Sequence, residues 1–206
     1  MDQEKETENN QFEEENFKFG KRKLQIKELT TGAILIAISI VLGTTGLGFI
    51  PLPLPILAGT IFHLPVIISG ILLGPEIGII TGFIFGIFSW YKYPMFPLHV
   101  MIPGRLLIGI TAYYSFALFN SLLKKSRSNK HFKITLSSSI AGVLGSLTNS
   151  IATLGLGVIF RVFGPELSAN LAVVKASIPV IISELIIAGL IVPPIIVAIF
   201  ALYKRD

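Results

Sequence analysis

The chain is a series of long apolar runs, and most of its charges and prolines lie outside these runs. Six runs can be drawn, at residues 29–49, 56–73, 77–91, 101–123, 134–160 and 176–203. A transmembrane helix needs about 20 apolar residues, so the second and third runs are short for a span and the last two are long. The pattern predicts an all-α integral membrane protein, a six-transmembrane-helix bundle.

Basic residues gather in three places: before the first run (18–27), between the fourth and fifth runs (124–133), and at the chain end (204–205). Cytoplasmic segments of membrane proteins are rich in Lys and Arg, so these places are expected on the cytoplasmic side. Both termini are then cytoplasmic, which requires an even number of spans. The net charge of +5 therefore reflects topology and does not indicate a nucleic-acid partner.

Composition separates a charged tail from a membrane domain. Hydrophobic residues make up 52% of the chain and charged residues 14%, which is too apolar for a soluble globular domain. Seven of the twelve acidic residues lie in the first fifteen positions, so residues 1–23 are predicted to be a disordered cytoplasmic tail. Residues 24–206 form the membrane domain. The chain has no cysteine, which excludes disulfides and thiolate metal sites.

Four polar residues interrupt the apolar runs: His63, Arg105, Asn149 and Glu184. Ionisable groups inside a membrane are costly and usually face a bundle interior or a cavity. All four map to the outer half, each on a different helix, so we expect them to line one outer pocket. Structural roles stay open for three of them: His63 bonded to a loop carbonyl, Arg105 extended to the headgroups, and Asn149 in an interhelical hydrogen bond.

The connections predicted on the outer side contain several prolines and aromatic residues, namely Pro51, Pro53, Pro55, Trp90, Tyr91, Tyr93, Pro94 and Pro97. Proline stiffens a loop, and Trp and Tyr favour the membrane interface. One interpretation is an ordinary aromatic belt. The other is a set of stiff loops that cover an outward-facing pocket, with Trp90 among its lining residues.

Small residues recur at helical spacing in two runs. Gly78, Gly82 and Gly86 form two consecutive GxxxG steps, which predict close packing inside the bundle. Ala33 and Ala37 lie four residues apart and therefore on one helical face. Taken alone, this alanine pair indicates ordinary packing between helices.

No pattern in the chain supports catalysis. It contains no Ser-His-Asp set, no HExxH, no Walker A motif and no paired carboxylates, and no spacing of His and Glu supports a metal site. We therefore expect no enzyme activity, no catalytic residue and no cofactor.

Two segments carry a resemblance to a known family: "HLPVIISGILLGPEIGIITGFIFGIFSW" at 63–90 and "IPGRLLIGI" at 102–110. Their pattern, HxPxIIxGxLLGPxxGxxxGxxFGxxS followed by PxRLLIG, is similar to the substrate-specificity (S) components of energy-coupling-factor (ECF) vitamin transporters. The resemblance extends over residues 24–205 and is nearest to the pantothenate-type, general branch. Six helices with both termini in the cytoplasm also fit this family.

The resemblance implies an ABC-type importer subunit of the cell membrane that binds a water-soluble vitamin from outside with high affinity. Such a subunit tilts in the lipid bilayer and delivers the vitamin inward together with a transmembrane coupling protein and two ATPases. Family members carry an AxxxA pair on the first helix that packs on the coupling protein. Ala33 and Ala37 match that pair, so the resemblance assigns them to a partner interface.

Pantothenate is the favoured ligand because Arg105 or His63 would hold its acid end, while Asn149 and Glu184 would bind its hydroxyl and amide groups. Riboflavin would need a flatter aromatic site; hydroxymethylpyrimidine and folate also stay open. Alternatives from other classes are an intramembrane enzyme that uses His63 and Glu184 as acid and base, and a structural or assembly membrane protein.

Overall fold

The computed structural model describes residues 26–51, 58–94, 96–124 and 128–203. The predicted tail at 1–23 and the prolines at 53 and 55 lie outside the described residues. The described part forms six helices and one pair of short strands: α2 (Ile26–Thr45), β1 (Phe49–Pro51), β2 (Ala58–Thr60), α3 (His63–Leu73), α4 (Pro75–Lys92), α5 (Leu98–Lys124), α6 (Lys130–Ile159) and α7 (Leu167–Tyr203). The helical class is as predicted, and the strand pair is an addition to it.

The second apolar run does not form one continuous helix. Its first part folds as β2, which pairs antiparallel with β1 so that Thr60 lies opposite Phe49. Only its last 11 residues form α3, which is about 16 Å of helix and about half of the hydrocarbon thickness. Helix α3 ends at Gly74, whose φ of 96° suits glycine, and Pro75 then begins α4. Among the described residues, four helices are long and apolar enough to cross a membrane: α2, α5, α6 and α7.

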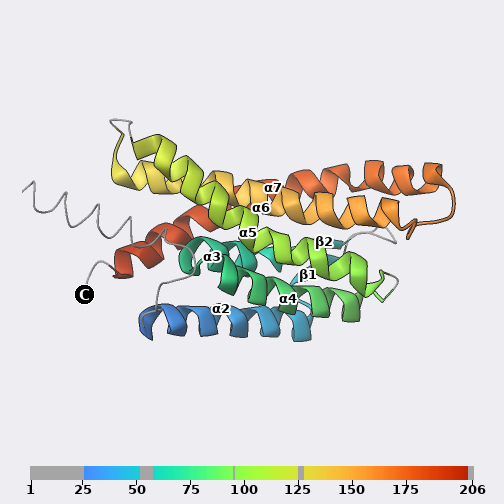
Figure 1. Ribbon diagram of the computed structural model, residues 1–206, viewed down its shortest axis with the longest axis horizontal. Coiled ribbons are helices and arrows are strands. Elements are labelled where there is room, and N and C mark those ends of the chain that lie inside the picture. The colour runs from blue at the N-terminus through green and yellow to red at the C-terminus, as the bar shows by residue number, and fades with distance from the viewer. Residues whose placement is uncertain (1–25, 52–57, 95, 125–127, 204–206) are drawn as a thin grey trace, which may run out of the picture.

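The last helix is longer than its apolar run. Helix α7 begins at Leu167 and has 37 residues with Pro179, Pro193 and Pro194 inside it, so the predicted start at 176 is wrong. Proline bends a helix because it lacks an N–H and its ring crowds the preceding turn. Figure 1 shows the C-terminal, red part of α7 turned away from the direction of its orange part.

Glycines let three helices meet closely. Helices α3, α4 and α5 approach one another at Gly70, Gly78 and Gly109, where a methyl group built on Gly78 would lie 2.8 Å from the Gly109 Cα atom. Gly82 likewise packs against the Arg105 backbone. The predicted role of the Gly78, Gly82 and Gly86 face in internal packing is therefore confirmed, and its effect is to place Arg105 against α4.

Aromatic rings fix the strand pair to the helices. Phe49 of β1 packs on Phe62 with their ring centroids 5.8 Å apart, and Phe62 packs on Phe85 of α4 at 4.6 Å. Phe62 is fully buried. Burial of rings this large holds β1 and β2 at one end of the bundle, hereafter the hairpin end.

Candidate functional site

His63 is the first residue of α3 and follows β2 after two residues. Its side chain is fully buried. The Nδ1 atom lies 3.3 Å from the Thr60 hydroxyl, in a hydrogen bond whose direction depends on the imidazole tautomer. The first residue of the short helix α3 therefore places a histidine side chain inside the bundle at the hairpin end.

Glu184 of α7 joins three elements. Its Oε1 atom accepts a 2.6 Å hydrogen bond from the backbone N–H of Thr60 in β2. Its Oε2 atom accepts a 3.5 Å hydrogen bond from the hydroxyl of Ser150 in α6. Because the carboxylate is buried, these two donors replace part of its lost hydration.

Arg105 of α5 is buried and lies between α4 and α6. Its Nη1 atom donates to the Thr153 hydroxyl, which in turn donates to the Asn149 carbonyl at 2.7 Å. The guanidinium carbon lies 5.1 Å from the centre of the Phe85 ring, a cation–π distance. The guanidinium also interacts electrostatically with Glu184 and His63, although no described hydrogen bond joins Arg105 to either of them.

Asn149 lies on the inward face of α6. One turn further from the hairpin end, Gly145 packs against Ile67 of α3, since a methyl group built on Gly145 would lie 2.8 Å from Ile67 Cγ1. Helices α3 and α6 run in opposite directions, so one turn back toward the hairpin end brings His63 and Asn149 to the same level. Asn149 is itself buried.

These side chains form one group, which we call the polar cluster: Thr60, His63, Arg105, Ser146, Asn149, Ser150, Thr153 and Glu184. In the described part of the chain, four buried atoms of the cluster have no hydrogen-bond partner: His63 Nε2, Arg105 Nε, Ser146 Oγ and Asn149 Oδ1. Burying an unsatisfied polar group costs about 1–3 kcal/mol. Four such atoms on α3, α5 and α6 mark a place where a hydrogen-bonding molecule would be stabilised.

The comparison with family models shows what kind of protein carries this cluster. Residues 27–201 match the model described as "ECF transporter, substrate-specific component". The chain belongs to this family. No curated protein matches the chain in sequence. The protein is therefore a multi-pass membrane transport protein, the substrate-binding subunit of an ECF importer and not an enzyme. Subunits of this kind bind a small molecule and work with a coupling protein and ATPases.

The structure of this S component brings together the four residues that the sequence placed at one depth: His63, Arg105, Asn149 and Glu184. Sequence reasoning missed Thr60, Ser146, Ser150 and Thr153. A signal for three of them was present on α6, because "SLTNSIAT" places Ser146, Ser150 and Thr153 at helical spacing around Asn149. The contact of Thr60 with Glu184 could not be seen, because it is made by the backbone N–H of Thr60.

Trp90 lies apart from the cluster. Its side chain is 42% exposed near the end of α4, and no described interaction joins it to a residue of the cluster. Within the described residues there is also no group of three or more His, Cys, Asp or Glu side chains that could hold a metal ion.

Ala33 and Ala37 lie on the exposed side of α2. The buried residues of this helix are Glu28, Gly32, Leu35 and Ser39, whereas both alanines are exposed. Helix α2 packs on α3 and α4, on the opposite side of the molecule from α6 and α7 (Figure 1). No packing among the described residues therefore buries the alanine pair.

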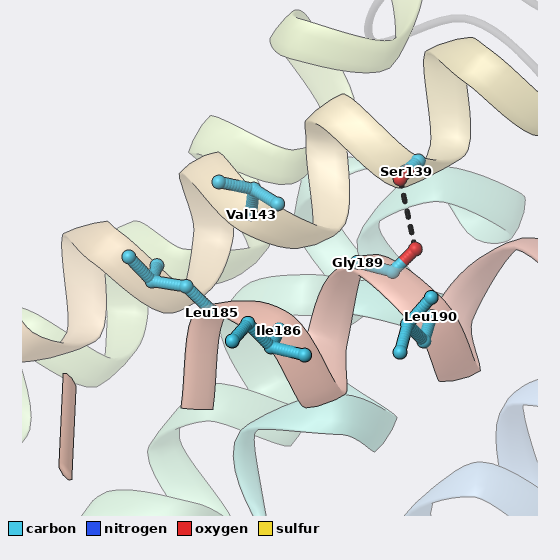
Figure 2. A pocket seen from close by; sticks show the side chains of 6 residues that line it. All are labelled: Ser139, Val143, Leu185, Ile186, Gly189 and Leu190. Carbon is cyan, nitrogen blue, oxygen red and sulfur yellow. Dashed lines mark hydrogen bonds between the residues drawn. The ribbon is translucent and has the colours of Figure 1, made fainter. Parts of the chain in front are cut away.

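A separate groove of about 300 Å³ lies between α6 and α7, lined by Ser139, Val143, Leu185, Ile186, Gly189 and Leu190 (Figure 2). Pro193 has no N–H to donate to the Gly189 carbonyl four residues earlier. The Ser139 hydroxyl donates to that carbonyl instead, at 2.8 Å. The remaining lining side chains are apolar, so the groove offers little for recognising a polar substrate.

Proposed function

We propose that the polar cluster binds the transported vitamin and that this vitamin is pantothenate. The four unpartnered buried atoms carry the proposal, because they belong to residues of three different helices that contribute to the polar cluster. The substrate-binding role of the family requires such a site. Pantothenate has a carboxylate, an amide and two hydroxyl groups, and the cluster combines hydrogen-bond donors and acceptors with both signs of charge.

Trp90 has a different part in this proposal. Its exposed side chain at the hairpin end meets the ligand as the ligand arrives. The final binding position of the ligand is the polar cluster. Riboflavin, hydroxymethylpyrimidine and folate are the competing vitamins. A large planar ligand fits less well, because the aromatic rings next to the cluster pack on one another, as Phe62 does on Phe85.

The identity of the ligand is tested by mass spectrometry of the small molecules that co-purify with the detergent-solubilised full chain. We expect pantothenate at close to one molecule per chain, and a depleted amount with Glu184→Ala. Ser183→Ala is the matched control, because Ser183 is exposed and bonds only within its own helix. A different vitamin in the purified protein would replace pantothenate and leave the cluster as the site. Equal retention by Glu184→Ala would reject the cluster.

We also propose a topology in which six helices cross or line the cell membrane and both termini lie in the cytoplasm. The short helix α3 is extended across the membrane by the strand pair. The hairpin end then faces outward, and the segment between α5 and α6 faces inward. The chain has no native cysteine, so single cysteines can be introduced directly. In intact cells, Ser168→Cys should react with a membrane-impermeant maleimide and His131→Cys should not; the reverse pattern would invert the topology.

A further inference from the structure

The free hydrogen-bonding atoms of the polar cluster specify the chemistry of the group that they bind. Asn149 Oδ1 can only accept a hydrogen bond, and Arg105 Nε can only donate one. Ser146 Oγ can do both, and His63 Nε2 can do either, depending on the tautomer. All four are buried without a partner among the described residues. A matching ligand group must therefore supply at least one donor and at least one acceptor.

A carboxylate does not meet this requirement. An ionised carboxylate only accepts hydrogen bonds, so it would leave Asn149 Oδ1 facing another acceptor. Hydroxyl and secondary amide groups offer a donor and an acceptor together. The hydroxyl and amide end of pantothenate therefore complements these atoms better than its acid end does.

The charges of the cluster lead to the same conclusion independently. Arg105 and Glu184 are both buried, and they bond to Thr153 and Ser150, whose hydroxyl groups lie three residues apart on α6. The Phe85 ring also lies against the guanidinium. A ligand carboxylate that entered this region would add a second buried acid beside Glu184 without a cation of its own, which is costly in a water-poor site.

We infer that the ligand enters the polar cluster with an uncharged end that carries both hydrogen-bond donors and acceptors, and that its carboxylate stays toward the hairpin end. This reverses the orientation expected from the sequence, in which Arg105 or His63 holds the acid. The inference rests on the proposed function, because it concerns the ligand of that same site.

The test compares pantothenate with pantothenol, in which a hydroxymethyl group replaces the carboxylate, by calorimetric titration of the purified full chain. We expect the dissociation constants of the two compounds to agree within about five-fold. β-Alanine, which carries the acid end alone, should not bind. Tight binding of pantothenate with a loss of more than about fifty-fold for pantothenol would overturn the inference and leave the proposed function intact.

If neither compound binds, pantothenate is rejected as the substrate, and hydroxymethylpyrimidine is compared with its carboxylate analogue instead. Binding of the neutral ring supports the inference, and binding of the carboxylate alone overturns it. Failure of all the probes overturns both proposals.

A variant gives a second measure: Glu184→Gln removes the negative charge beside Arg105, so it should shift relative affinity toward the acid by about ten-fold or more, whereas Ser183→Ala should not. An unchanged preference in Glu184→Gln would also contradict the inference.

Discussion

Asn149 and Thr148 are neighbours on α6 whose polar atoms have different surroundings. The Thr148 hydroxyl bonds to the Leu144 carbonyl of its own helix, whereas Asn149 Oδ1 is buried without a partner in the described part of the chain. A buried unsatisfied acceptor lowers stability and is useful only if something binds to it. Asn149 therefore combines a stability cost with the capacity to recognise a ligand.

Replacing Asn149 should separate these two effects. We expect Asn149→Leu, which has a similar volume and no polar atom, to weaken ligand binding at least about five-fold, because one hydrogen bond in a buried site is worth about 1 kcal/mol or more. The ligand-free protein should be equally stable or more stable by up to about 1 kcal/mol. Thermal unfolding in detergent and titration measure the two quantities, with Thr148→Val as the control. A large loss of stability in the ligand-free variant would show that Asn149 is structural.

For stability, replacing Glu184 should have the opposite effect to replacing Asn149. Its removal by Glu184→Ala leaves the Thr60 N–H and the Ser150 hydroxyl without their acceptor and leaves the Arg105 charge unbalanced. We expect the free energy of unfolding to fall by about 2–4 kcal/mol, since breaking a buried charged network costs this much. Thermal unfolding next to Ser183→Ala checks the value. A loss below about 1 kcal/mol would show that the carboxylate does not hold β2 on α7.

At the scale of elements, the meeting of α3, α4 and α5 depends on glycine. A methyl group on Gly109 would lie 2.5 Å from the Gly78 Cα atom, whereas one on Gly155 of α6 would meet nothing within 4 Å. Gly109→Ala should therefore destabilise the protein by about 1–3 kcal/mol. Gly155→Ala should be neutral or stabilising by up to about 1 kcal/mol, because alanine favours a helix. Similar unfolding temperatures for the two variants would mean that the three helices can separate without cost.

The exposed face of α2 gives a second prediction at this scale. We expect Ala33→Trp to prevent assembly with the coupling protein, because the bulk of tryptophan would keep two helices apart at a small-residue contact. Co-purification of the full complex and vitamin uptake measure the effect. Ile151→Trp is the matched control, since Ile151 is also exposed and lies on α6, away from α2. Normal assembly of Ala33→Trp would place the coupling protein on another face, while vitamin binding by the isolated chain should stay unchanged in either case.

At the scale of the whole molecule, the features that could be predicted best from the sequence are those that are energetically costly in a membrane. Buried His63, Arg105, Asn149 and Glu184 could be selected because polar groups in apolar runs are costly and usually functional, and the six apolar runs predicted the six helices. The division of residues 56–73 into β2 and α3 could not be predicted, since a continuous apolar run has no period that separates strand from helix. The early start of α7 was hidden because residues 167–175 are less apolar than the run that follows.

The most direct test of substrate binding by the polar cluster is calorimetric titration of pantothenate into the purified full chain, without coupling protein or nucleotide. We predict saturable binding of one pantothenate per chain, weakened at least about five-fold by Asn149→Leu and preserved in Thr148→Val. The absence of pantothenate binding, or equal binding by Asn149→Leu and the unaltered protein, would contradict the proposal.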